Sequence, residues 1–324
     1  MPMSHAIKTS VSAACSFIAG IAKDFWKDGN WGAEDELDRP IIHEKPKPVE
    51  KPKPAPVKPK VTEEPPPSED MTEWSAADRI DLLEKIWGTK QLLPMDTEMT
   101  DILLKPLNLN SNARVLDLAA GIGARMRKAE ELFGVYIIGK EPNAEAAKRG
   151  MDITVKSGMI KKLPIEAYDP NDLKESRPYD CIMFREILCY VKDKVKFIKA
   201  LSEYSKPNAQ IVFTDFILAS KMHGAAILEE LRQLDAGFSP MTLKELEAKM
   251  SEHGIGFRVS EDLTEQYKEA VQEGLLRFIK FLESSITLDA KTKRLILAEI
   301  NLLSKRLAAL EKDIRFYRFY STKN

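Results

Sequence analysis

The chain has 324 residues, of which 31% are charged and 44% are apolar, and its formal net charge is −1. This balance is typical of a water-soluble globular protein and gives no indication of nucleic-acid binding. The three cysteines show no paired spacing and the four histidines are scattered. We therefore expect neither a metal site nor a disulfide framework, and the few unpaired cysteines favour a reducing, cytoplasmic location.

Residues 1–39 form a predicted leader with an amphipathic helix. Within residues 6–27, apolar side chains recur at helical spacing and lysines fall mostly on the other side. The stretch is too short and too interrupted to span a bilayer, which takes about 20 apolar residues. It could lie on a membrane surface, which would make the protein peripheral there, or dock on a protein partner or the chain's own domain. A weak signal peptide is a third interpretation.

Residues 40–71 alternate proline with lysine, valine and glutamate. Each proline fixes its φ angle and removes a backbone donor, so neither a helix nor a sheet ladder is expected. About 25 residues in the polyproline conformation would extend roughly 75 Å, at about 3.1 Å per residue. We interpret this segment as a disordered, stiff linker, with a recognition site for a groove-binding module as the alternative.

Residues 72–324 form a third segment, in which predicted helices and strands alternate. Ser75 followed by Asp78 resembles a capping box at the start of a helix that runs to Trp87. The other predicted elements, in chain order, are a strand at Ala113–Leu118, a helix at 123–133, a strand at Val135–Gly139, a short helix at Ala144–Arg149, a strand near Asp152–Val155, a strand at Asp180–Phe184, a helix at 192–204, a strand at Gln210–Asp215, a long helix at Leu295–Leu310 and a final strand at Ile314–Ser321. This alternation predicts an α/β fold with a doubly wound, mostly parallel sheet, which binds ligands at the carboxyl ends of its strands.

The most informative motif runs from Val115 to Gly123, where an apolar strand ends in a carboxylate and enters a turn of small residues. Such a turn lets the backbone approach a ligand, and the helix that follows offers free amide donors. The next strand ends at Glu141, twenty-four residues after Asp117, where a carboxylate can accept both hydroxyls of a ribose. This pair would serve a dinucleotide or S-adenosylmethionine equally well.

The third segment resembles the class I S-adenosylmethionine-dependent methyltransferases over its whole length. The resemblance is carried by Asp-x-Ala-x-Gly-x-Gly at 117–123, Lys161–Pro164 before Tyr179-Asp180, Lys206-Pro207-Asn208 before the strand that ends in Thr214-Asp215, Met241–Leu243 leading a helix, and His253–Phe257. It implies a Rossmann-like fold with a C-terminal helical insertion, and S-adenosylmethionine as the cofactor. A final strand after a long helix argues against an NAD-dependent enzyme.

The resemblance also assigns cofactor-binding residues. Asp117 and the backbone at Ala119, Gly121 and Gly123 would hold the methionine part, and Glu141 the ribose. The family usually has an aspartate after its third strand, near the adenine amine. The predicted third strand is followed here by Ser157-Gly158-Met159 without an acid, so Met159 would cover the adenine face.

Within this superfamily the domain looks most like the phosphoethanolamine N-methyltransferases. The likeness runs from Trp74 through Ile86-Trp87-Gly88 and Phe184-Arg185-Glu186 to Tyr320–Asn324, and its departures include Ala236-Gly237-Phe238, where that family has an arginine and a tyrosine that clamp a phosphate. Arg185 and Lys305 fall where that family has cofactor-side and phosphate-binding basic residues. Trp74 and Tyr190 stand in place of a tyrosine and a histidine that order the site, and Phe216 replaces a site tyrosine.

Methyl transfer from a sulfonium to an amine depends on positioning more than on acid–base chemistry, and aromatic faces stabilise the cation that forms. Trp74, Tyr190 and Phe216 could do this or could simply be core residues. Glu186 could accept the amine proton or cap a helix. We expect a methyltransferase acting on a small molecule or a lipid headgroup, with an amine as acceptor. The alternative is a non-catalytic scaffold tethered to a membrane or partner by its N-terminal segment.

Overall fold

The computed structural model describes residues 74–220, 225–283 and 288–324. The chain divides into two units between Glu73 and Trp74. The predicted leader helix at residues 6–27 and the predicted linker at residues 40–71 lie outside the described residues, and so do the first two residues of the predicted third segment.

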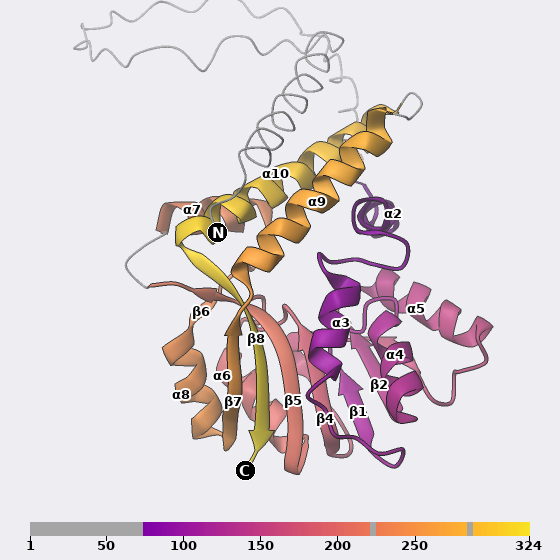
Figure 1. Ribbon diagram of the computed structural model, residues 1–324, viewed down its shortest axis with the longest axis vertical. Coiled ribbons are helices and arrows are strands. Elements are labelled where there is room, and N and C mark those ends of the chain that lie inside the picture. The colour runs from indigo at the N-terminus through magenta and orange to yellow at the C-terminus, as the bar shows by residue number, and fades with distance from the viewer. Residues whose placement is uncertain (1–73, 221–224, 284–287) are drawn as a thin grey trace, which may run out of the picture. The chain divides into compact units, whose positions relative to one another are not determined.

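One sheet contains the eight strands of the described residues, in the order β3-β2-β1-β4-β5-β8-β7, with β6 paired to β5 (Figure 1). The strands are β1 (Arg114–Asp117), β2 (Tyr136–Glu141), β3 (Ile165–Ala167), β4 (Tyr179–Arg185), β5 (Ser205–Leu218), β6 (Met241–Thr242), β7 (Ile255–Asp262) and β8 (Ile314–Lys323). The pairs are parallel except those of β8, which runs antiparallel between β5 and β7. The predicted doubly wound, mostly parallel sheet is confirmed.

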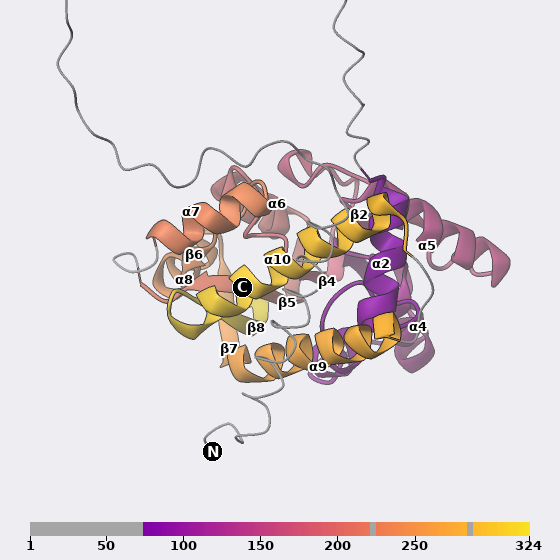
Figure 2. The same cartoon turned by 90° about the horizontal axis from the view of Figure 1, so that it is seen from above.

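Helices cover the sheet and the carboxyl ends of its parallel strands. They are α2 (Ala76–Trp87), α3 (Asp96–Leu104), α4 (Ala124–Phe133), α5 (Ala144–Lys156), η1 (Pro170–Asp172), α6 (Lys194–Glu203), α7 (Ala225–Leu234), α8 (Leu243–Glu252), α9 (Thr264–Glu283) and α10 (Ala290–Lys312). Helices α9 and α10 are the predicted insertion before the final strand, and they lie with α2 above the carboxyl ends of the strands (Figures 1 and 2). No described helix is both long and apolar enough to cross a membrane.

Helix α2 begins where the sequence predicts it. The Ser75 hydroxyl accepts a hydrogen bond from the Asp78 amide, and the Asp78 carboxylate accepts one from the Ser75 amide, which completes a capping box. Ion pairs then fix the helix at both sides, since Arg79 binds Glu299 of α10 at 2.9 Å and Arg149 of α5 binds Asp81 at 2.5 Å. The helix is thereby held across the carboxyl edge of the sheet.

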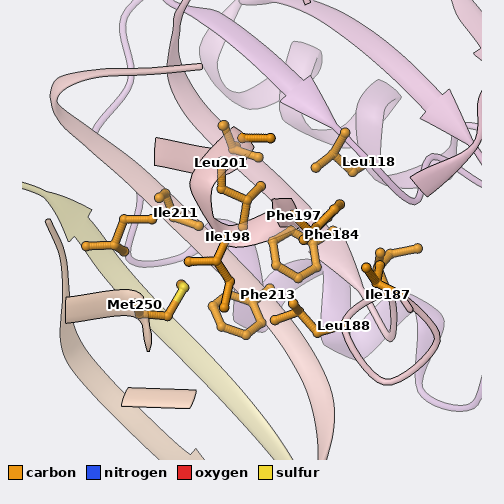
Figure 3. Close-up of a cluster of buried hydrophobic side chains, with 14 of the residues drawn as sticks. Leu118, Phe184, Ile187, Leu188, Phe197, Ile198, Leu201, Ile211, Phe213 and Met250 are labelled. Carbon is orange, nitrogen blue, oxygen red and sulfur yellow. The ribbon is translucent and has the colours of Figure 1, made fainter. Parts of the chain in front are cut away.

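Aromatic side chains on three neighbouring strands hold the centre of the sheet. The ring of Phe213 on β5 stacks on Phe184 of β4 and on Phe319 of β8, with centroids 4.6 Å apart in both pairs. Figure 3 shows Phe184 and Phe213 among the aliphatic side chains of this core, including Ile198 and Leu201 of α6. Such close packing gives the strand ends that follow little freedom to move.

The strand predicted near Asp152–Val155 is wrong, because α5 continues through these residues to Lys156. The β-branched residues there favour a strand, but Thr154 lies on the same buried helical face as Ala147 and Gly150, and tertiary packing overrides local propensity. The third strand is β3, and it is followed by Tyr168 and Asp169. An acid therefore does follow the third strand, and the departure expected at Ser157–Met159 is corrected.

Candidate functional site

A cavity of about 510 Å³ opens at the carboxyl ends of β1, β2 and β4, beneath α2 and α10. This volume is typical of sites for small ligands. We name its two ends after the strands beside which they lie. The β1–β3 end contains Ala119, Gly121, Arg125, Glu141, Asn143 and Asn171, and the β4 end contains Arg79, Glu186, Tyr190, Asp235, Glu299 and Arg306.

The turn after β1 contains two glycines with left-handed backbone conformations. Gly121 has a φ of +54° and lines the cavity, whereas Gly123 has a φ of +84° and begins α4 as its N-cap. A Cβ atom at Gly123 would lie 2.9 Å from the Ile165 side chain. Gly123 therefore shapes the turn from behind, and the backbone at Gly121 and Ala119 is the part that a ligand can reach.

Glu141 connects the ends of β1 and β2. Its Oε2 atom accepts a hydrogen bond from the Gly121 amide at 2.7 Å, and its Oε1 atom accepts one from the Asn143 amide at 2.9 Å. The side chain lines the cavity but is largely buried. Burial raises the pKa of the carboxyl to about 7, although the two amide donors act to lower it. A carboxylate has about four acceptor positions, so two remain for the hydroxyls of a ribose.

The affinity for S-adenosylmethionine, the cofactor expected from the sequence, should rise with pH as the Glu141 carboxyl ionises. Hydroxyl donors favour the ionised carboxylate, and the raised pKa leaves this group mostly protonated below about pH 7. Between about pH 6 and pH 8 the dissociation constant should fall by about tenfold and then level off. Calorimetric titration measures this, and Glu141→Gln should bind more weakly with no such pH dependence. An unchanged wild-type affinity across this range would contradict the role of Glu141.

Arg125 separates Asp117 from the cavity. The Asp117 carboxylate is fully buried and accepts hydrogen bonds from Arg125 Nε at 3.0 Å, Arg125 Nη2 at 2.6 Å and the Ala119 amide at 3.1 Å. Asp117, predicted to contact the cofactor, does not line the cavity, and Arg125 lines it instead. The sequence did hold a signal. A cation at the second position of a helix opposes the helix dipole and needs a carboxylate partner.

Arg185 and Glu186 follow one another at the end of β4. The Arg185 side chain is fully buried and donates to Asp96 Oδ1 at 2.9 Å and to the Pro94 carbonyl at 3.0 Å. It lines the cavity and holds the segment before α3 in place. Glu186 has a φ of +55°, a strained conformation for a residue other than glycine, and its burial raises the pKa of its carboxyl. Strain of this kind is often found at functional sites.

The remaining side chains of the β4 end form a hydrogen-bonded cluster. Tyr190 donates to Asp235 Oδ2 at 2.6 Å, and Arg306 Nη2 donates to the same oxygen at 2.5 Å and to the Tyr190 hydroxyl at 3.0 Å. The carboxylates that line this end are those of Asp96, Glu186, Asp235 and Glu299, against the guanidinium groups of Arg79, Arg185 and Arg306. The end therefore carries one more carboxylate than guanidinium, which favours a ligand with a positive charge.

Three predicted site residues lie away from the cavity. Trp74 is 37% exposed and precedes the N-cap of α2. Met159 lies between the end of α5 and the start of β3. Phe216 is buried among Phe238, Tyr267 and Phe316. None of the three lines the cavity. Phe216 is a core residue, as the alternative interpretation had it, whereas Trp74 is partly exposed. Met159 was predicted from the wrong third strand and precedes β3.

Lys305 also lies outside the cavity. Its ammonium pairs with Glu230 of α7 at 2.5 Å, and its side chain is 40% exposed. The neighbouring Arg306 points inward instead and lines the cavity. The α10 cation that lines the cavity is therefore Arg306 and not Lys305. Among the described residues, no group of three His, Cys, Asp or Glu side chains is arranged to hold a metal ion.

A family model described as "Methyltransferase domain" matches residues 94–270. Phosphoethanolamine N-methyltransferase 1 of Arabidopsis thaliana is 20% identical over 205 residues, which cover 63% of this chain and 41% of that protein. The chain therefore spans about two-fifths of the length of the curated relatives it matches.

Two solved structures are similar in fold. Phosphoethanolamine N-methyltransferase 2 of Haemonchus contortus, in complex with phosphomonomethylethanolamine and S-adenosylhomocysteine, has a TM-score of 0.66 and 18% identity, over 76% of this chain and 56% of that one. A putative sarcosine dimethylglycine methyltransferase from Galdieria sulphuraria has a TM-score of 0.65 and 15% identity, over 76% of this chain and 98% of that one. The similarity to the Galdieria sulphuraria protein covers nearly the whole of that chain.

Proposed function

We propose that this chain, which belongs to the methyltransferase domain family, transfers a methyl group from S-adenosylmethionine to the nitrogen of a small amine that also carries an anionic group. The observation that carries the proposal is the set of charges at the β4 end of the cavity. There, ion pairs join Glu186 to Arg185, Asp235 to Arg306 and Glu299 to Arg79.

The β1–β3 end fits S-adenosylmethionine. Glu141 retains acceptor positions for the ribose hydroxyls, and the left-handed turn at Gly121 leaves the backbone bare toward the cavity. Pro170 and Asn171, which follow β3, complete this end. When bound, the cofactor supplies an electrophilic methyl group on its sulfonium.

Carboxylates at the β4 end suit an amine acceptor. An amine arrives mostly as an ammonium ion, which the extra carboxylate attracts, and it must lose a proton before it can attack the methyl carbon. Methyl transfer then forms one N–C bond, breaks one S–C bond and leaves a thioether. The raised pKa of Glu186 equips its carboxylate to take the proton from nitrogen. The Tyr190 hydroxyl, held by Asp235, helps to position the amine.

Guanidinium groups at the same end suit an anionic group on the substrate. Arginine binds phosphate and carboxylate alike, through parallel hydrogen bonds. The two similar structures are named for amines with such groups, phosphomonomethylethanolamine in one and sarcosine and dimethylglycine in the other. Arg306 is the stronger candidate, because its guanidinium is held against Asp235 and over the ring of Phe216.

The test is an activity assay with paired acceptors. The full chain is incubated with S-adenosylmethionine and with phosphoethanolamine or ethanolamine, or with sarcosine or dimethylamine, and the S-adenosylhomocysteine formed is measured. We expect the acceptor with the anionic group to have a kcat/KM at least about tenfold higher within one pair, since a charge-assisted hydrogen bond contributes about 1.5–3 kcal/mol.

Glu186→Gln serves as the control, because it should remove turnover while S-adenosylhomocysteine still binds. Cofactor binding without methylation of any of these acceptors would overturn the proposed reaction and favour the non-catalytic scaffold. Equal turnover within both pairs would overturn the requirement for an anionic group.

A further inference from the structure

We propose that Arg125 binds the carboxylate of the cofactor's methionine part, and that the turn after β1 offers no acceptor to the methionine ammonium. This inference rests on S-adenosylmethionine being the cofactor, as in the proposed function. It concerns which end of the amino acid the protein recognises.

The first observation is that Arg125 lines the cavity and binds both acceptors beside the turn, while the Asp117 carboxylate is fully buried. Arg125 donates two hydrogen bonds to the Asp117 carboxylate and a third, from Nη2, to the Ala119 carbonyl at 2.8 Å. These are the carboxylate and the carbonyl that an ammonium group at this turn would otherwise use. A guanidinium in this position repels a second cation and attracts an anion.

The second observation is that Arg125 keeps one donor for a ligand. Its Nη1 atom makes no hydrogen bond with any described residue, yet it is not enclosed like the buried polar atoms that lack a partner. The side chain lines the cavity while only 4% of it is exposed. The guanidinium is therefore fixed before a ligand arrives, which reduces the entropy lost on binding.

The third observation is the uncapped start of α4. No side chain caps this ten-residue helix at Gly123, and its first turn contains no acidic residue. Ala124 and Arg125, its first two residues, line the cavity. Free amides at a helix N-terminus favour an anion, as does the guanidinium beside them. Both sets of donors therefore favour a carboxylate at the same place.

Stability alone does not explain why the pair of Asp117 and Arg125 is present. A buried ion pair is often no more stabilising than apolar residues of the same volume, because both charges lose their water. Burial alone would lower the pKa of Arg125, but the Asp117 charge and hydrogen bonds raise it above its ordinary value. The pair thus keeps a permanent cation at the wall of the cavity.

The experiment compares two cofactor analogues on the unmodified full chain by calorimetric titration. One is S-adenosylhomocysteine without its carboxylate, and the other is S-adenosylhomocysteine without its amino group. We expect the loss of the carboxylate to weaken binding by about tenfold to a hundredfold, as for a charge-assisted hydrogen bond. The loss of the amino group should change the affinity by less than about threefold.

The double variant Asp117→Asn with Arg125→Leu leaves no unpaired charge in the core and should lose most of the preference for the analogue that keeps the carboxylate, since only the amides of α4 remain to bind it. A wild-type preference for the analogue that keeps the amino group would overturn the role of Arg125 while leaving S-adenosylmethionine as the cofactor. If S-adenosylhomocysteine itself did not bind, the cofactor assignment would fall, and the proposed function and this inference with it.

Discussion

Replacing Gly121 by arginine should abolish S-adenosylmethionine binding and leave the domain folded. Gly121 lines the cavity, and the nearest atom to a Cβ built there is a methyl group of Leu92 at 3.8 Å. A long side chain therefore has room to enter the cavity, where it would take the space of the ligand. We expect the dissociation constant to rise by about a hundredfold or more, equivalent to about 2.7 kcal/mol, in a calorimetric titration.

The matched control is Gly158→Arg. Gly158 has a φ of +71°, against +54° at Gly121, so both variants carry the cost of a left-handed conformation, about 1–2 kcal/mol. Nothing lies within 4 Å of a Cβ at Gly158, which is outside the cavity. Both variants should lose a few degrees in melting temperature, but only Gly121→Arg should lose binding. Equal affinities in the two variants would show that the cofactor lies elsewhere.

Replacing Arg306 by methionine should reduce both acceptor turnover and stability. The change leaves Asp235 without its cation in a site where only 10% of Arg306 and 18% of Asp235 are exposed. Breaking a buried pair costs about 3–5 kcal/mol, and we expect the lower value because of this residual exposure. The kcat/KM for an anionic amine should fall by about tenfold to a hundredfold, while the affinity for S-adenosylhomocysteine changes little. Denaturant unfolding and steady-state kinetics measure the two effects.

Lys305→Met is the matched control for Arg306→Met, since the two residues are adjacent on α10. Lys305 is half-exposed and pairs outside the cavity, and exposed ion pairs contribute about 0–1 kcal/mol. Its loss should leave turnover unchanged. Adding Asp235→Asn to Arg306→Met should restore part of the stability but none of the turnover. A Lys305 variant with the larger defect in turnover would reverse this assignment.

The β1–β3 end of the cavity could be predicted from the sequence because its determinants are local. The turn at Gly121 and the carboxylate at Glu141 each follow a predicted strand directly, and the topology of a parallel sheet brings such strand ends together. The motif therefore indicated the edge of the sheet at which the cavity opens. The motif did not show that Arg125 would bind the Asp117 carboxylate and separate it from the cavity, because this depends on the side-chain conformation of Arg125.

The β4 end of the cavity was harder to predict because it is assembled from elements that lie far apart in the sequence. Its residues come from α2, from the segment after β4, from the end of α7 and from α10, so no single sequence spacing links them. The choice between Lys305 and Arg306 depends on the rotation of α10. Buried Leu302, Leu303, Ala309 and Leu310 place Arg306 on their face, and this periodicity is visible in the sequence.

The single wrong strand had the widest effect on the predicted site. Placing it near residues 152–155 moved the end of the third strand to Ser157, which led to an apparent missing acid and to Met159 as an adenine contact. The end of α5 is set by its packing on β2 and β3, a tertiary constraint that local propensity does not contain. One error in a strand position can thus shift every residue predicted from it.

The position of β8 has a consequence for how the protein is made. Among the described strands, β7 pairs only with β8, and β8 ends at Lys323. While the ribosome is still synthesising α9 and α10, β7 therefore has no neighbour in the sheet, and β5 has an unpaired edge. The pairing that joins β5 to β7 through β8 is non-local, because α9 and α10 lie between β7 and β8 in the chain, and non-local pairing slows folding. Arg306 belongs to α10, so the β4 end of the cavity cannot be complete until α10 has been synthesised.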